Sequence, residues 1–207
     1  RPPRSTPLYS SAASDVYKRQ VIKGSRDNEK ITSSDDLEYA MDKFNSQFPD
    51  IRVGNGYDVH PFSEGDFVTI CGIKIPYKKA LDGHSDADVG FHALTDAILG
   101  ALGKGDIGES FPSSDEQWKN ANSQVFLEHA GECVGAMNAI IMNLDITIIC
   151  ETPKIVSFRR QMINKISAIL NISPSRVNVK GKTNDKLGFV GREEGVAAHA
   201  NATILMQ

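Results

Sequence analysis

The sequence contains few cysteines and no long apolar run. The three cysteines, Cys71, Cys133 and Cys150, are odd in number and far apart, so they indicate neither a disulfide framework nor a cysteine-based zinc knuckle. This cysteine usage fits a reducing compartment. No apolar stretch approaches the roughly 20 residues that a helix needs to span a bilayer. We therefore expect neither disulfides nor a membrane partner.

A strong net charge is also missing. The chain carries 23 Lys and Arg against 26 Asp and Glu, which gives a formal net charge of −3. That balance lacks the basic surface on which nucleic-acid binding depends, so we expect no nucleic-acid partner. An anionic substrate would have to be held by local hydrogen-bond donors, metal ions or helix N-termini.

Length and composition fit one domain with a tail. The 207 residues are 40% hydrophobic and 24% charged, as in ordinary globular proteins. We interpret residues 1–20 as a non-native or artefactual leader, because LYSSAASDVYKRQ resembles translated adapter sequence, although the Ser- and Arg-rich composition also matches a transit peptide. Residues 21–50 are predicted to be a polar tail with a short amphipathic helix over Asp35–Phe48, and residues 51–207 the main domain.

Apolar periodicity predicts interleaved strands and helices in the main domain. Strands and helices in this order predict an α+β fold, in which one mixed β-sheet is covered by helices in a two-layer subunit. The expected strands are Ile51–Val59, Phe67–Tyr77, Leu144–Glu151, Val177–Lys182 and Val196–Met206, and the expected helices are Asp86–Leu102, Ser123–Ile141 and Ser157–Leu170.

The first strand carries a candidate metal-binding pair. Asp58 and His60 are two residues apart, so their side chains share one face of the strand and can reach one ion. Val59, between them, is predicted to point into the core. By itself this pattern is weak, because the two polar residues could equally be unrelated.

A third ligand could come from His84 or His92. His92 lies off the apolar stripe of its predicted helix, and Asp96 one turn later could orient the imidazole or be only a satisfied polar neighbour. Two histidines and one carboxylate with an open fourth position form a catalytic type of zinc site. His84 precedes the predicted helix at Asp86, where N-terminal N–H groups would favour a phosphate.

Several separated motifs carry a resemblance to a known family. They are RVGNGYDVHPF at Arg52–Phe62, GHSDADVGFHALTDAILGALGKGDIG at Gly83–Gly108, the pair Phe111-Pro112, and VNVKGKTNDKLGFVGREEGVAA at Val177–Ala198. In this order they resemble the methylerythritol cyclodiphosphate synthase family over about residues 51–207.

The resemblance implies an enzyme of non-mevalonate isoprenoid biosynthesis. Such an enzyme cyclises a CDP-linked methylerythritol 2-phosphate and releases CMP, as a homotrimer with active sites between subunits. Zinc or another divalent cation would be bound by Asp58, His60 and His92, and a second cation, magnesium or manganese, by the substrate and Asp185. His84 and Thr183 would be catalytic.

The resemblance also implies a set of substrate-binding residues. They are Ser85, Asp106, Ile107, Gly108, Phe111, Pro112, Ser113, Ser114, Asp115, Cys150, Glu151, Thr152, Pro153, Lys154, Ile155, Val156, Gly181, Lys182, Asp185, Phe189 and Arg192. Three of these depart from the family pattern: Ser113, Lys182 and Asp185 stand where Asp, Thr and Glu are usual. The shorter Asp185 would reach a metal less easily.

Three alternatives remain open. A zinc phosphoesterase would use the same ligands but let water attack, and a trimeric binding module would hold zinc structurally, normally with four protein ligands. The chain could also be a fragment of a fusion with a cytidylyltransferase, although residues 21–34 show no trace of one. The expected compartment is a plastid-type organelle in a eukaryote or the cytoplasm of a bacterium.

Overall fold

The computed structural model describes residues 30–112, 114–118 and 121–207. The predicted leader at 1–20, residues 21–29 of the tail and Ser113 therefore lie outside the described residues. The chain divides into two units, which separate between Phe48 and Pro49.

The first unit contains the predicted amphipathic helix. The helix, α2 (Ser34–Gln47), has nearly the predicted bounds. At its start, Ser33 Oγ accepts the N–H of Asp36 while the Asp36 carboxylate accepts the N–H of Ser33. This reciprocal pair satisfies two backbone donors that a helix N-terminus leaves free.

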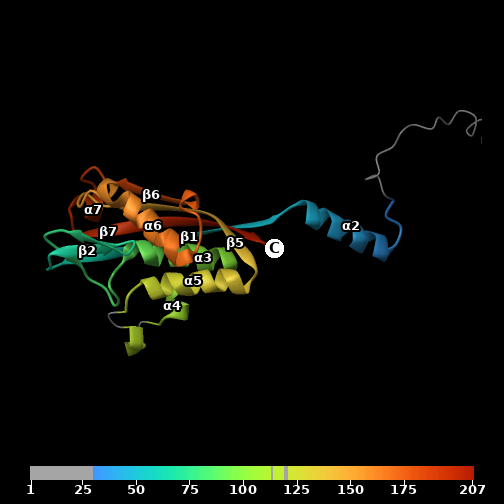
Figure 1. Cartoon of the computed structure of the whole chain (residues 1–207), viewed down its shortest axis with the longest axis horizontal. Coiled ribbons are helices and arrows are strands. Elements are labelled where there is room, and N and C mark those ends of the chain that lie inside the picture. Colours follow the sequence, from blue (N-terminus) through green and yellow to red (C-terminus); the bar gives the residue numbers. More distant parts are fainter. Residues whose placement is uncertain (1–29, 113, 119–120) are drawn as a thin grey trace, which may run out of the picture. The chain divides into compact units, whose positions relative to one another are not determined.

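The second unit is built on one five-stranded mixed sheet (Figure 1). The strand order is β4-β1-β7-β5-β6, and only β5 and β6 are parallel among these pairs. A separate hairpin pairs β2 with β3. The bounds are β1 (Asp50–Ser63), β2 (Phe67–Ile70), β3 (Ile73–Pro76), β4 (Ala80–Leu81), β5 (Ala139–Ile149), β6 (Val177–Lys182) and β7 (Gly195–Met206).

Helices cover one face of this sheet, which confirms the predicted α+β arrangement. Gly54 and Gly56 of β1 face α3: a Cβ on them would lie 2.1 Å from the Ala97 carbonyl oxygen and 2.0 Å from that of Ala93. Only glycine allows this close approach. The helices are α3 (Val89–Leu102), α4 (Ile107–Ser110), α5 (Gln124–Ala136), α6 (Arg159–Leu170) and α7 (Gly188–Gly191), with 3₁₀ turns η1 (Glu116–Trp118), η2 (Ile155–Phe158) and η3 (Pro174–Arg176).

Several element boundaries differ from the sequence predictions. The predicted strand Phe67–Tyr77 is a hairpin, because Cys71 and Gly72 both adopt positive φ and turn the chain. The helix expected from Asp86 begins at Val89, since the Asp88 carboxylate accepts the N–H groups of its first turn. The helix expected to reach Ile141 ends at Ala136, and β5 begins at Ala139.

Within the second unit, the described residues leave the other face of the sheet open. Ile51, Val53, Tyr57 and Val59 alternate with the helix-facing residues of β1, and each side chain is substantially exposed; we call these four residues the β1 apolar row. The prediction that Val59 points into the core was therefore wrong, because the described helices of the second unit cover only the opposite face of the sheet.

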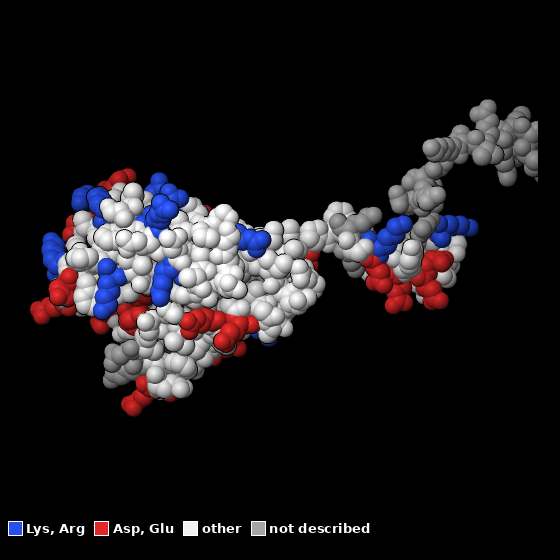
Figure 2. All heavy atoms as spheres, viewed as in Figure 1, with Lys and Arg blue, Asp and Glu red and all other residues white. Residues whose placement is uncertain are grey.

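Charges do not gather into one basic surface on the side shown in Figure 2, where Lys and Arg are scattered among uncharged side chains. Among the described residues, none of the helices has the length and apolar character required to cross a bilayer.

Candidate metal centre and adjoining cavity

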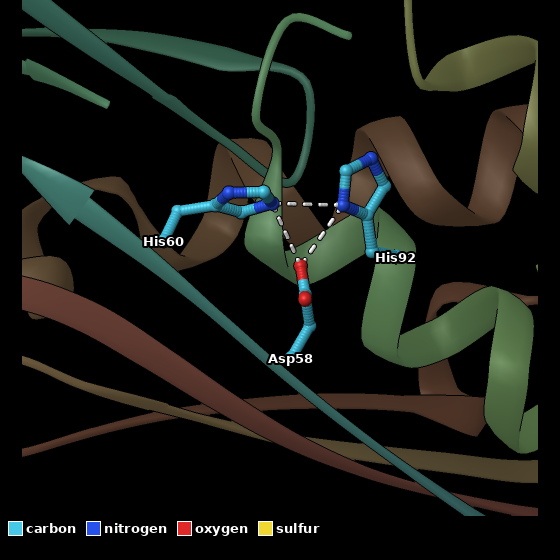
Figure 3. Close-up of side chains that lie close together, drawn as sticks. All are labelled: Asp58, His60 and His92. Atoms are coloured by element: carbon cyan, nitrogen blue, oxygen red, sulfur yellow. Dashed lines mark hydrogen bonds and ion pairs between the residues drawn. The ribbon is translucent and has the colours of Figure 1, made fainter. Parts of the chain in front are cut away.

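Asp58, His60 and His92 converge on one point between β1 and α3 (Figure 3). Asp58 Oδ2 lies 3.0 Å from His60 Nε2 and 2.9 Å from His92 Nδ1, and the two nitrogens are 3.1 Å apart. Strand period places the first two side chains on one face, and α3 brings the third across from it. The structure thus selects His92 over His84 as the third member of the group.

A backbone carbonyl fixes the tautomer of His60. His60 Nδ1 lies 2.9 Å from the carbonyl oxygen of Asp82. A carbonyl oxygen only accepts hydrogen bonds, so Nδ1 carries the proton in the neutral ring. His60 Nε2 therefore directs a lone pair toward Asp58 and His92.

The other ring nitrogen of His92 contacts two serines. His92 Nε2 lies 2.8 Å from Ser123 Oγ and 3.0 Å from Ser85 Oγ. The prediction that Asp96 orients this ring was wrong: the Asp96 carboxylate instead accepts the N–H of Ile107 and so fixes the start of α4.

The three groups perturb one another's pKa values. Burial by itself raises the pKa of the Asp58 carboxyl, but hydrogen bonds and charge from His60 and His92 outweigh it and lower that pKa well below the usual range. Burial lowers the pKa of His60, but the hydrogen bond and charge of Asp58 outweigh it and raise the pKa. Asp58 is therefore ionised at neutral pH and favours a positive charge beside it.

The donor set fits a divalent cation. A carboxylate and two imidazoles are ligands that zinc accepts, and at Zn–N distances of 2.0–2.1 Å tetrahedral ligands are about 3.3 Å apart. The observed separations of 2.9–3.1 Å are close to this value. A divalent cation held by these three groups would keep one position open, as in catalytic zinc sites.

A cavity of about 320 Å³ adjoins the centre. It is lined by His60 and His92, by the predicted catalytic His84, and by an aromatic wall of Phe111, Trp118 and Phe126. Six predicted substrate-binding residues line it too: Ser85, Ile107, Gly108, Phe111, Pro112 and Ser114. The structure thus brings this part of the predicted site together.

Two further predicted residues lie at the edges of this region as helix caps. The Asp106 carboxylate accepts the N–H of Glu109 at the start of α4, and the Asp115 carboxylate accepts the N–H of Gln117 before η1. Neither residue lines the cavity. Their carboxylates hold the turns that present Ile107 and Phe111 to it.

A second group of predicted residues gathers where the parallel strands β5 and β6 end. The Cys150 N–H donates to the Lys182 carbonyl at 2.9 Å, and a Cβ on Gly181 would lie 2.9 Å from the Ile155 Cβ. Thr152, Pro153, Lys154 and Val156 belong to the same loop as Cys150 and Ile155. The structure therefore places the loop 150–156 against residues 181–182.

The Glu151 side chain joins this loop to the next one. Its Oε1 accepts the N–H groups of Asn184 and Lys186, at 3.0 and 3.2 Å. These N–H donors lower the pKa of the Glu151 carboxyl. Within the second loop, Thr183 Oγ1 donates to Asp185 Oδ1 at 3.2 Å, so the predicted catalytic threonine and the predicted ligand of the second cation are neighbours.

Phe189 and Arg192 follow in the chain, on α7 and just after it. Phe189 is 37% exposed, and Arg192 is engaged by Glu194, with Nε–Oε1 at 2.7 Å.

In the part of the chain that the structure describes, the cavity beside the metal centre does not include the second group of predicted residues. Asp58, Ala198, Ile148 and Gly181 form one row across β1, β7, β5 and β6. Three strand spacings separate Asp58 from Gly181, which is about 14 Å. The 320 Å³ cavity contains none of the residues 150–156 or 181–185.

The sequence matches the YgbB family over residues 51–205, a range that includes the triad, the cavity wall and both loops. The chain belongs to the YgbB family.

Curated relatives of this YgbB-family chain are larger proteins. The "Bifunctional enzyme IspD/IspF" of Mesorhizobium japonicum is 52% identical over 189 residues, which cover 90% of this chain and 46% of that protein. The enzyme of the same name from Bartonella bacilliformis is 54% identical over 189 residues, covering 90% and 48%. The chain thus spans about half the length of the curated relatives it matches. The alignments also extend before residue 51, further than the resemblance noted from the motifs.

Solved structures of related proteins share the fold. IspF of Plasmodium falciparum, in a CDP complex, has a TM-score of 0.67 and 39% sequence identity, and the match covers 76% of this chain and 97% of that one. The bifunctional IspDF from Campylobacter jejuni has a TM-score of 0.71 and 34% identity, covering 95% and 53%. A 2C-methyl-D-erythritol-2,4-cyclodiphosphate synthase in a CDP-bound form has a TM-score of 0.67 and 34% identity, covering 73% and 98%.

Sequence reasoning missed Trp118, Phe126 and Ser123 as parts of the YgbB-family site. From the sequence we expect Trp118 to be a packing residue, and it does pack edge-on against Phe111, but it also lines the cavity. Ser123 precedes a helix and so has the pattern of an N-cap, which gave no signal of a contact with His92, 31 residues earlier.

Proposed function

We propose that the chain is a metal-dependent 2-C-methyl-D-erythritol 2,4-cyclodiphosphate synthase, a phosphorus–oxygen lyase of non-mevalonate isoprenoid biosynthesis. It converts 4-diphosphocytidyl-2-C-methyl-D-erythritol 2-phosphate to the 2,4-cyclodiphosphate and releases CMP. The observation that carries the proposal is the Asp58, His60 and His92 group beside a cavity, within the segment that matches the YgbB family.

In this reaction an oxygen of the 2-phosphate attacks the β-phosphorus of the same molecule. A new P–O bond closes the ring, and the P–O bond to CMP breaks. Both reacting groups are anionic, so the protein must offset their repulsion and hold a flexible chain in a bent geometry. A divalent cation, when bound, supplies charge neutralisation and polarises a phosphoryl oxygen. No protein nucleophile is required.

The residues of the cavity can perform the positioning. Phe111, Pro112 and Trp118 provide an apolar wall against which the methylerythritol carbons pack, and this wall excludes water from the attacking phosphate. His84 and Ser85 line the same cavity, where the His84 ring can donate a hydrogen bond to the diphosphate and the Ser85 hydroxyl oxygen lies beside it. The expected binding of a phosphate at the N-terminus of α3 is not part of this proposal, because the Asp88 carboxylate already accepts those N–H groups.

The loops 150–156 and 181–185 would receive the cytidine and the second cation. The Glu151 carboxylate of the first loop accepts the N–H groups of Asn184 and Lys186, and Thr183 and Asp185 are exposed beside them. Magnesium or manganese at Asp185 would neutralise the diphosphate. The matching IspF structure from Plasmodium falciparum is a CDP complex, which supports a CDP-linked substrate here.

We propose that a complete site includes a second copy of the chain. Asp58, beside the cavity, and Gly181, beside the cytidine loops, lie about 14 Å apart across one sheet. The β1 apolar row exposes Ile51, Val53, Tyr57 and Val59 on an uncovered sheet face. We propose a homotrimer in which this face is buried and the cavity of one subunit meets the loops of its neighbour.

The test is to identify the reaction products by mass spectrometry. Metal-loaded protein is incubated with the CDP-linked substrate, beside metal-stripped protein and the His60→Ala variant. Cyclic diphosphate and CMP are expected from the loaded native chain alone. Linear phosphate products would replace the proposal by the phosphoesterase alternative. Tightly bound zinc without turnover would support the binding-module alternative.

The fusion alternative has gained support from the size of the bifunctional relatives, whose matched part is about half of each protein. The compartment stays a prediction.

A further inference from the structure

Ser123 occupies the N-cap position of α5 but does not cap the helix. A serine there usually accepts the N–H of the second or third helical residue. Ser123 makes no such bond, and its backbone is already helical, with φ −61° and ψ −10°. Its side chain is fully buried and turns to His92, with Oγ 2.8 Å from Nε2.

The hydrogen bonds of Ser123 can be assigned a direction. Its hydroxyl contacts Asp86 Oδ1, Ser85 Oγ and His92 Nε2. A hydroxyl has one proton to donate and two lone pairs. A carboxylate only accepts, so the Ser123 proton goes to Asp86, and the hydroxyl must accept from His92 and from Ser85. His92 therefore carries its proton on Nε2 and directs the lone pair of Nδ1 toward Asp58 and His60.

We infer that Ser123 and Asp86 are positioning residues of the metal centre: Asp86 orients the Ser123 hydroxyl, which holds the proton of His92 on Nε2 and so keeps Nδ1 free for the cation. The inference rests on the metal-binding part of the proposed function. For His60, the Asp82 carbonyl oxygen holds the ring proton on Nδ1 and so keeps Nε2 free for the cation. Partners of this kind fix both the tautomer and the ring orientation of metal-binding histidines.

A serine that served only packing would be satisfied differently. Ser167, on α6, is 4% exposed, and its hydroxyl donates to the Ile163 carbonyl of its own helix at 2.7 Å. Ser123 is equally buried but makes no cap and donates its proton to Asp86. Ser167→Ala is therefore the matched control, since it removes a buried hydroxyl that has no connection to the centre.

The first measurement is the zinc affinity of the full chain, by competition with a chromogenic chelator. Ser123→Ala should weaken zinc binding about 10- to 100-fold, the range found when outer partners of metal ligands are removed. Asp86→Asn should weaken it in the same direction, because an amide can donate to Ser123 and let the hydroxyl donate to His92. Ser167→Ala should bind zinc as the native chain does.

The second measurement reports the tautomer, which a packing role would not change. In metal-free protein with ¹⁵N-labelled histidine, at a pH where the rings are neutral, native His92 should be protonated on Nε2. Ser123→Ala should move part of the population to the Nδ1-protonated form. Ser167→Ala should leave the spectrum of His92 unchanged.

The outcomes separate this inference from the proposed function. If the native chain binds no zinc, the metal-dependent function fails and the inference fails with it. If the native chain binds zinc, and Ser123→Ala changes the affinity by less than about twofold with the proton still on Nε2, the inference alone is overturned. If Ser123→Ala does not fold, Asp86→Asn decides by the same two measurements, because it keeps the Ser123 hydroxyl in place.

Discussion

At the scale of single residues, the centre is three lone pairs brought within hydrogen-bond distance of one another. Such an arrangement is repulsive unless a cation or a proton lies among the three atoms. The lowered pKa of Asp58 and the raised pKa of His60 both express this demand for positive charge.

Replacing Asp58 by asparagine should therefore weaken divalent-cation binding more than the removal of any outer partner does. We expect a loss of more than about 100-fold in zinc affinity, because the amide keeps the shape but not the charge. Isothermal titration of metal-free protein measures this. Asp145→Asn is the control, since Asp145 pairs with Lys180, and it should leave the affinity unchanged. Equal affinity of Asp58→Asn and native protein would exclude Asp58 as a ligand.

Metal binding should also depend on pH through His60. A raised pKa keeps His60 protonated to a higher pH than a free histidine, and the protonated ring cannot bind the cation. Zinc affinity should thus fall about tenfold per pH unit below that pKa. The stability of the metal-free protein should change with pH in the opposite direction. The ion pair between protonated His60 and Asp58 stabilises the fold fully at a pH below the ordinary histidine pKa, and this stabilisation is lost as the pH rises through the raised pKa of His60. Zinc titrations and thermal unfolding over a pH series measure both; flat profiles would contradict this prediction.

At the scale of single residues, the sequence predicted part of the metal centre correctly. The strand period placed Asp58 and His60 together, and the structure confirms that they meet His92. What the period could not give was the direction of the core, so Val59 was assigned to the wrong environment. The hydrogen-bond partners of His92 could not be predicted either, because Ser123 is distant in sequence and its local pattern is that of a helix cap.

At the scale of elements, the centre depends on how closely α3 lies on β1. Gly54 and Gly56 remove the side chains that would hold the helix away from the strand, and Asp58 and His60 continue on the same face. The boundary errors in the sequence predictions have a related cause. Asp88 is buried and accepts N–H groups both from the β2–β3 turn, at Cys71, and from the first turn of α3, so a long-range contact sets where the helix begins.

Gly56→Ala should destabilise the fold and move α3. An added Cβ would lie 2.0 Å from the Ala93 carbonyl oxygen, a backbone atom that cannot yield without shifting the helix. Overpacking of this kind costs about 3 kcal/mol of unfolding free energy. Urea denaturation at fixed protein concentration measures it. Gly135→Ala is the control, because no atom lies within 4 Å of its added Cβ, and in a helix it should gain up to about 1 kcal/mol. Equal effects at the two positions would contradict the close-packing account.

At the scale of the whole molecule, the feature still to be explained is the sheet face that the described residues of the second unit leave exposed. Val53 is 68% exposed, and in a lone chain Val53→Asp would cost almost nothing. In the proposed trimer the same change buries charge in an apolar interface and should cause dissociation. Analytical ultracentrifugation of Val53→Asp, beside Val125→Asp on α5 as the control, measures this. A native chain that is monomeric at all concentrations would refute the trimer.

Assembly is also the part of the site that the sequence could not predict from residue spacing alone. The resemblance to a family implied a trimer, but periodicity and motifs describe only one chain. The separation of Asp58 from Gly181 across the sheet is what gives the expectation a physical reason.

The cross-strand row from Asp58 to Gly181 has a genetic consequence. In the proposed trimer each chain contributes one half to each of two sites, so two inactive chains with lesions in different halves can complement one another. His60→Ala and Thr183→Ala chains, each inactive alone, should regain activity when they are refolded together. In a random equal mixture about a quarter of the active sites should have both halves intact. Two chains damaged in the same half, such as His60→Ala with Asp58→Asn, should stay silent together. Regained activity would mean that a mutation inactivates only the half-site in which it lies. No regained activity would mean that each chain builds its active site alone.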